Sequence, residues 1–444
     1  MPTSRKSRLS IWWWELSYRV GPNLWVTPVL MSAFSLALFA LTRWIDRYET
    51  ISTPLPEFLI ARSPADAALV LTALVSTIGT ALALVFSTSI LTFSIASSQL
   101  GPRLIRRFMR DPVTQVTLGG FLATLIFCVL TLATVRTGTS DGVPEVSFSV
   151  AVLASLSCFG LLVYYVHRVA STIQAPNVVA GVVDQLGEAL DERDRYLPSV
   201  PRCRDLDLIR HIVAQARSEG GALVSVRSGY IDLLDHPRLL HAAISADAVL
   251  VLERRPGQFV VAGQTLCHVL PADAAPAIAH VVAEAIEIGP ARTLRQDLEF
   301  AIAQVVEIAM RALSPAVNDT YTGLTCIDWL GAALVDMGQH PYDTGGWSGD
   351  DDRLRLVVPS LRFDRLIKTA FDTIRQAGAD NPAVLIRLLD SLGTLVPMVL
   401  PEHRRAVSDQ VELVMEMIRA AQFASGDLDD AERRYDRITA ALAG

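Results

Sequence analysis

The chain has 444 residues, of which 51% are apolar and 19% are charged, and its formal net charge is −7. This high apolar share with so few charges is typical of a membrane protein and argues against a chain that is soluble throughout. The second half of the sequence has no cluster of basic residues, which argues against a nucleic acid as the partner.

Four apolar runs before residue 168 are long enough to cross a hydrocarbon core about 30 Å thick, which takes about 20 helical residues. We predict spans over residues 24–41, 67–98, 113–135 and 146–166, within a transmembrane domain over residues 1–170. The alternative is four buried helices of a soluble protein. The charges that flank the runs disfavour this alternative, because a soluble protein has no reason to sort them.

Positive charge gathers at one side of the predicted spans. Basic residues precede the first span and follow the second: Arg5, Lys6, Arg8, Arg103, Arg106, Arg107 and Arg110. In the connections after the first and third spans, arginines are balanced by nearby carboxylates. Because positively charged loops stay in the cytoplasm, we predict a multi-pass protein in a lipid bilayer with both termini cytoplasmic.

The second predicted span has a stripe of small and hydroxyl-bearing residues. They are spaced by three, four or seven positions: Ser76, Thr80, Ala83, Ser87, Ser94 and Ser98. This spacing places them on one face of a helix. A helix surrounded by lipid needs no such face, so we expect the stripe either to line a hydrated pore or to pack against another helix.

The same run continues as SSQLGPRLIRR, which brings a polar residue and several arginines to its cytoplasmic end. About 32 helical residues would measure about 48 Å, so this helix must tilt, kink or project from the bilayer. The end could form the cytoplasmic mouth of an anion-selective pore, with Gln99, Arg103, Arg106 and Arg107. Alternatively, the arginines contact anionic lipid headgroups.

The remaining chain, about 270 residues, is predicted to be a cytosolic α+β region. We divide it into a helical connector (171–221), a β-rich module (222–271), a helical segment (272–340), a linker (341–353) and a C-terminal helical region (354–444). A helix of the last region should start at Asn381-Pro382. The five cysteines show no metal-like spacing and agree with a reducing compartment.

In the β-rich module, the segment GQFVVAGQTLCHVL resembles half of a barrel-sandwich domain of the biotinyl or lipoyl type. Such domains hold their cofactor on a lysine, and this hairpin has none, since the chain contains only Lys6 and Lys368. We therefore expect no cofactor, and a structural or oligomerising role for the module.

Polar residues around the next helix form a second candidate site. Asp297 and Arg311 lie in steps of seven with Gln304, and Asn318 and Asp319 follow a helix-breaking proline. An Asn-Asp-Thr sequence there suits the cap of the following helix. The alternative is a small polar site for an ion or metabolite, formed by Asp297, Arg311, Asn318 and Asp319.

No pattern typical of an enzyme emerges. There is no glycine-rich phosphate loop opening a helix, no nucleophile elbow and no metal-binding histidine pair. The three adjacent carboxylates Asp350, Asp351 and Asp352 could hold a cation, but we favour a solvated loop as the explanation. We expect no catalytic activity.

Four segments, SIASSQLGPRLI, RSGYIDLLD, RPGQFVVAGQTL and RALSPAVNDTYTG, resemble a bacterial family of predicted membrane proteins, domain of unknown function 2254. The resemblance covers nearly the whole chain and implies a bacterial inner-membrane protein, but no activity. The chain departs from the family pattern at Thr320, where proline is expected, and at Gly323, where alanine is expected.

Two functions follow from these features. The first is an oligomeric ion channel or transport protein gated through its cytosolic region, with the stripe lining the path. The second is a non-conducting scaffold or sensor, with the stripe as a packing face. We expect a homo-oligomer in either case. Charged residues do not interrupt the predicted span cores, which disfavours a proton-coupled transporter.

Overall fold

The computed structural model describes residues 24–48, 63–100, 111–137, 143–172, 178–184, 187, 202–341, 344–349 and 351–443, without the side chains of residues 96–100, 136, 137 and 172. The chain divides into two compact units, Met1–Gln174 and Ala175–Gly444. The two units are built differently: the described part of the first is helical, and the second contains helices and strands.

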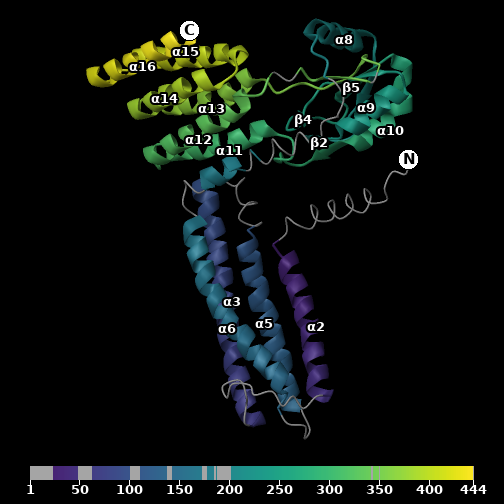
Figure 1. The fold of residues 1–444 in the computed structure, drawn as a ribbon, viewed down its shortest axis with the longest axis vertical. Coiled ribbons are helices and arrows are strands. Elements are labelled where there is room, and N and C mark those ends of the chain that lie inside the picture. The colour runs from purple at the N-terminus through teal and green to yellow at the C-terminus, as the bar shows by residue number, and fades with distance from the viewer. Residues whose placement is uncertain are drawn as a thin grey trace. The chain divides into compact units, whose positions relative to one another are not determined.

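The described part of the first unit consists of four long helices (Figure 1). They are α2 (Val26–Tyr48), α3 (Pro64–Leu100), α5 (Pro112–Thr137) and α6 (Glu145–Thr172). All four are long and apolar enough to cross a membrane, and they correspond to the four predicted spans. Helix α3 has 37 residues and therefore measures about 55 Å, well above the hydrocarbon thickness of about 30 Å.

Helix α5 contacts the other three helices of this unit. Its buried Phe121 packs in a cluster with Ile78 and Val85 of α3 and with Tyr165 of α6. Polar contacts also join the helices: the hydroxyls of Ser89 and Tyr165 lie 2.6 Å apart in the buried interface. Interhelical hydrogen bonds and small residues are the usual means by which membrane helices associate.

Asp46, near the end of α2, caps the start of α6. Its carboxylate accepts hydrogen bonds from the backbone N–H of Val146 (2.9 Å) and Ser147 (3.2 Å) and from the Ser147 hydroxyl (2.5 Å). The first N–H groups of a helix have no partner within the helix, so a carboxylate there is stabilising. The contact ties the first predicted span to the fourth.

The described residues of the second unit form two sheets. The five-stranded sheet has the order β1 (Gly221–Val224), β5 (Thr265–Leu270), β3 (Val249–Leu252), β8 (Leu354–Val357), β7 (Gly346–Ser348). The three-stranded sheet has the order β4 (Phe259–Val260), β2 (Gly229–Leu234), β6 (Ile286–Gly289). Strands β3 and β8 pair in parallel, and every other pairing is antiparallel.

Alternate residues of β3 face opposite sides of the five-stranded sheet. Leu250 and Leu252 belong to the core formed with α9 (His236–Ser245) and α10 (Ala275–Ala285). Val251 belongs to a second cluster, formed with Ile209 and Ala216 of α8 (Leu206–Glu219). The sheet is therefore covered by helices on both faces.

Among the residues that the structure describes, six further helices follow β6 (Figure 1). They are α11 (Leu298–Ala312), α12 (Thr320–Gly338), α13 (Phe363–Ala377), α14 (Pro382–Met398), α15 (Arg404–Ala420) and α16 (Ser425–Ala443). Asn381 caps α14 by accepting a hydrogen bond from the backbone N–H of Ala383, so the predicted helix start at Asn381-Pro382 is confirmed.

The mixed sheet differs from the predicted arrangement of segments. Strand β7 lies in the predicted linker, and β8 begins the region predicted to be wholly helical. Both strands are only three or four residues long, and β8 pairs with a strand about 100 residues earlier, so no local periodicity marks them. Of the three adjacent carboxylates in this linker, Asp351 pairs with Arg355 at 2.7 Å and Asp352 has a φ of +56°.

Candidate functional site

The predicted stripe lies on the outer face of α3. Ser76, Thr80, Ser87 and Ser94 are all exposed in the single chain. The packed face of the helix consists of residues that include Ile78, Val85 and Ser89, which are buried against α5 and α6. At 100° per residue, Ser76 and Ile78 point about 160° apart. The stripe therefore faces away from the four-helix bundle and does not line a path inside one copy.

Hydroxyl groups along this face are partly satisfied by the helix itself. The Ser76 hydroxyl donates to the carbonyl of Thr72 (3.0 Å), and the Thr80 hydroxyl donates to the carbonyl of Ser76 (2.9 Å). Thr77 makes the same type of bond to Ala73 at 2.8 Å. Because these donors already have acceptors, the face can be buried without water, although water is equally able to bind there.

The predicted cytoplasmic mouth is mostly outside the described residues. Ser98 and Gln99 lie in the last turn of α3, where the helix is described but the side chains are not. Arg103, Arg106 and Arg107 lie outside the described residues. The mouth stays a prediction.

The predicted polar site is divided between the two ends of α11. Asp297 is the N-cap of this helix, and Arg311 lies 14 residues further on, about 21 Å along the helix axis. Asp319 lies near the Arg311 end, since its N–H donates to the carbonyl of Ala312 at 2.8 Å. Asn318, with a φ of +50°, precedes it in the same turn. The structure thus brings Asn318 and Asp319 to the end of α11 that carries Arg311, and places Asp297 at the other end.

Asp319 acts as a helix cap. It accepts hydrogen bonds from the N–H (3.1 Å) and the hydroxyl (2.6 Å) of Thr322, at the start of α12. This is one of the three capping residues that the Asn-Asp-Thr sequence suggested.

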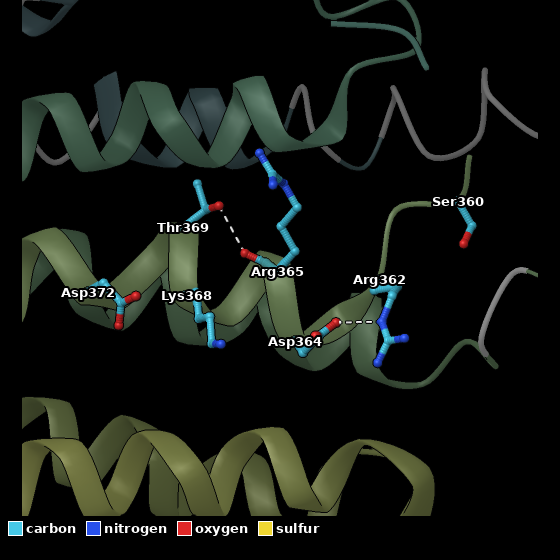
Figure 2. A pocket seen from close by; sticks show the side chains of 7 residues that line it. All are labelled: Ser360, Arg362, Asp364, Arg365, Lys368, Thr369 and Asp372. Carbon is cyan, nitrogen blue, oxygen red and sulfur yellow. Dashed lines mark hydrogen bonds and ion pairs between the residues drawn. The ribbon is translucent and has the colours of Figure 1, made fainter. Parts of the chain in front are cut away.

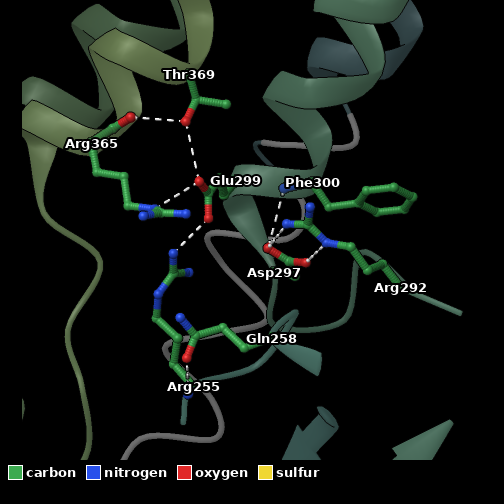
Figure 3. A network of polar contacts seen from close by, with 8 residues as sticks. All are labelled: Arg255, Gln258, Arg292, Asp297, Glu299, Phe300, Arg365 and Thr369. Carbon is green, nitrogen blue, oxygen red and sulfur yellow. Dashed lines mark hydrogen bonds and ion pairs between the residues drawn. The ribbon is translucent and has the colours of Figure 1, made fainter. Parts of the chain in front are cut away.

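Asp297 belongs to a buried ionic network (Figure 3). Its side chain is only 3% exposed. It accepts hydrogen bonds from Arg292 Nε (2.6 Å) and Nη2 (2.9 Å) and from the N–H of Phe300 (3.1 Å). Burial raises the pKa of Asp297, although the hydrogen bonds and charge of Arg292 act in the opposite direction.

Glu299, two residues further on, lies between two guanidinium groups (Figure 3). Its carboxylate accepts hydrogen bonds from Arg255 (2.5 Å) and Arg365 (2.8 Å) and from the Thr369 hydroxyl (3.1 Å). Burial alone would raise the pKa of Glu299, but the hydrogen bonds and charges of the two arginines outweigh it and hold this pKa below its ordinary value.

This network joins three parts of the second unit. Arg255 lies in the turn between β3 and β4, Glu299 in the first turn of α11, and Arg365 in α13. These three residues were not predicted from the sequence, because they lie 44 and 66 positions apart along the chain. The available signal was an acidic residue at the start of an apolar helix, which by itself indicates only a favourable charge at a helix N-terminus.

The part of the chain that the structure describes contains no metal-binding cluster, and two of its buried cysteines are unreactive. No group of three histidine, cysteine or carboxylate side chains there could hold a metal ion. Burial raises the pKa of the Cys267 and Cys326 thiols to about 12, so both are protonated near neutral pH.

Comparison with known proteins gives the same picture of a membrane protein. Residues 22–394 match the family described as predicted membrane protein (DUF2254). An uncharacterized protein of Mycobacterium bovis and another of Mycobacterium tuberculosis are each 28% identical to the chain over 430 residues, which cover 94% of this chain and 79% of the relative. No solved structure matches.

Proposed function

Because this chain belongs to the DUF2254 family of predicted membrane proteins, we propose that it acts as a homo-oligomer assembled through the outer face of α3. We place it in the bacterial inner membrane, with both termini and the second unit in the cytosol. The assembled α3 helices then line a water-filled path for small ions, and the second unit gates this path.

The observation that supports this proposal is the position of the stripe. In the described spans, α2 and α6 present large apolar side chains outward, for example Phe34, Leu156 and Val163, as lipid contact requires. Helix α3 presents Ser76, Thr80, Ser87 and Ser94 on its outer face, mixed with apolar residues. The Ser76 and Thr80 hydroxyls donate within the helix, but their oxygens can still accept hydrogen bonds from water or from another protein chain. A second copy of the chain offers the same face in return.

A non-conducting scaffold or sensor is the second candidate. It is favoured by the backbone hydrogen bonds of Ser76 and Thr80, which allow α3 helices to meet closely without water between them. The channel and the scaffold therefore share the interface between α3 helices. They differ in whether water fills this interface.

Accessibility of a cysteine at position 87 tests the choice. We use Ser87→Cys in a Cys203→Ser background, because Cys203 is the one native cysteine that is not buried. A wet path predicts that a small charged thiol reagent reacts with this cysteine and changes the conductance of the purified protein in bilayers. Ser157→Cys, at an exposed position of α6, is the matched control and should stay unreactive.

The oligomeric mass of Ser87→Leu completes the test. Unreactive Ser87→Cys together with a misassembled Ser87→Leu would replace the channel by the scaffold, since the bulky side chain then keeps two packed helices apart. A wild-type protein that is monomeric in mild detergent and in lipid would overturn both candidates.

We also propose that the β-rich module over residues 222–271 is a barrel-sandwich-like structural element that carries no cofactor. The absence of a lysine from its hairpin supports this role. Intact-mass measurement should find the unmodified chain, and a biotinyl or lipoyl adduct would contradict the proposal.

A further inference from the structure

An open pocket of about 560 Å³ lies against α13 in the second unit (Figure 2). This volume is within the range of small-molecule sites, roughly 300–1,000 Å³. Its lining includes three cationic side chains, Arg362, Arg365 and Lys368, together with Asp364, Asp372 and two hydroxyl groups. The pocket is thus a polar site with both signs of charge.

The carboxylates of the pocket already have donors. Asp364 accepts a hydrogen bond from Arg362 at 3.0 Å. Asp372 accepts one from the Gln410 amide at 3.0 Å and lies 3.7 Å from an Arg375 nitrogen. Neither carboxylate is therefore a strong obstacle to an anion in the pocket.

Two cationic side chains of the pocket are incompletely paired with carboxylates. Arg365 has Glu299 as its acidic partner, but this single carboxylate also faces Arg255, so two guanidinium charges share one negative charge. Lys368 is exposed, and none of the described residues supplies it with an acidic partner. The pocket therefore has an excess of positive charge at Arg365 and Lys368.

We propose that this pocket binds a small phosphate ester, with Arg365 and Lys368 contacting the phosphate. The planar guanidinium of Arg365 can donate two hydrogen bonds to phosphate oxygens, and the Lys368 ammonium supplies a point charge. Asp364 and Asp372 can accept hydrogen bonds from hydroxyl or amino groups of the same ligand, which favours an ester over a bare polyanion. The ester is either a soluble metabolite or the headgroup of an anionic lipid.

Ligand binding in this pocket would also affect contacts elsewhere in the second unit. A phosphate that takes hydrogen bonds from Arg365 competes with Glu299, which then keeps only Arg255 and Thr369 as donors. Arg255 lies in the turn between β3 and β4, so occupancy of the pocket changes an ionic contact of the β-rich module. This coupling rests on the proposed gating function, whereas the binding itself does not.

The test is calorimetric titration of the full-length protein, in nanodiscs of neutral lipid, with glycerol 3-phosphate at constant ionic strength. We expect saturable binding, which Lys368→Gln weakens about tenfold because a charge-assisted hydrogen bond is lost. Arg437→Gln removes an exposed charge from α16 and should leave the affinity unchanged. No saturable binding by the wild type, or equal binding by Lys368→Gln, would overturn the proposal.

A second variant should change the affinity for glycerol 3-phosphate in the opposite direction. Glu299→Gln removes the competing carboxylate, so it should bind glycerol 3-phosphate several-fold more tightly, an effect that general destabilisation of the fold does not produce. Weaker binding by this variant, with the protein folded, would contradict the role of Arg365.

Nanodiscs with phosphatidic acid distinguish the two sources of the ester. If this lipid displaces glycerol 3-phosphate, the ligand is a lipid headgroup, and if it does not, the ligand is soluble. Conductance is measured separately on the same samples, so binding without conductance refutes the channel alone, and conductance without binding refutes the pocket alone.

Discussion

Gly257 and Gly263 both have a φ of +85°, but only one of them has a close neighbour. A Cβ atom at Gly257 would lie 1.9 Å from Asp297 Oδ2, whereas a Cβ at Gly263 would meet nothing within 4 Å. The first glycine is therefore required by both backbone conformation and packing, and the second by conformation alone.

Substitution by alanine should therefore lower the free energy of unfolding by different amounts at the two positions. Gly263→Ala should lower the free energy of unfolding by about 1 kcal/mol, the usual cost of a left-handed backbone for a non-glycine residue. Gly257→Ala should lower it by about 3 kcal/mol or more, because it displaces the buried Asp297 from its partner Arg292. Denaturant unfolding of the two full-length variants in the same detergent measures the difference. Equal losses would mean that the contact with Asp297 is not tight.

The carboxylate of Glu299 should make stability depend on pH. Its pKa is lowered in the folded protein, so its contribution is fully present above the unfolded value of about 4.3 and is lost as pH falls through the folded value. At pH 7, Glu299→Gln should lower the free energy of unfolding by about 3 kcal/mol, since the buried guanidinium of Arg255 loses its acidic partner, whereas the exposed Arg365 adds little.

The decrease in the free energy of unfolding caused by Glu299→Gln should therefore become smaller below about pH 4, because the wild-type carboxylate is then protonated as well. Glu287→Gln is the matched control. Glu287 pairs with Arg295 at 2.8 Å, but the Glu287 side chain is 51% exposed, and the buried Arg295 keeps Asp232 as a second partner at 3.4 Å, so we expect a small loss. Unfolding curves at pH 7 and pH 3.5 check both variants, and a loss that is independent of pH would contradict the ionised role of Glu299.

At the scale of elements, two serines of α3 separate folding from assembly. Ser89 is buried and lies 2.6 Å from the Tyr165 hydroxyl, whereas Ser87 is exposed on the outer face. Ser89→Leu should therefore disturb the packing of α3 on α6 within one copy, by roughly 1–3 kcal/mol through overpacking. Ser87→Leu should leave this packing intact and reduce the oligomeric mass.

Thermal unfolding in detergent and light scattering measure the two effects separately. If both variants lower only the unfolding temperature, the outer face of α3 has no role in assembly. If Ser89→Leu changes neither quantity, the contact between Ser89 and Tyr165 contributes little to the bundle.

Elements specified by local sequence could be predicted, and those specified by distant contacts could not. Apolar runs identify the four spans because length and hydropathy are local properties. The caps at Asp319 and Asn381 were similarly predictable, since each side chain bonds to a backbone N–H two or three residues on. The pairing of β8 with β3 and the contacts of Glu299 join residues 44 to about 100 positions apart, and one sequence has no local signal for them.

At the scale of the whole molecule, the charge asymmetry predicts four spans with both termini in the cytosol. Reporter fusions after Tyr48 and after Asp141 should therefore report the outside. Fusions after Arg107 and at Gly444 should report the inside. An outside signal from the Arg107 fusion would reverse the orientation and move the predicted arginine mouth to the other surface.

The parallel pairing of β8 with β3 also has a consequence for biosynthesis. Strand β3 emerges from the ribosome about 100 residues before β8, and until then one edge of the apolar run Val249–Leu252 has no hydrogen-bonding partner. An unpaired apolar edge can recruit strands of other chains. The nascent protein must therefore shield this edge, or be shielded by a chaperone, until residue 357 has left the exit tunnel.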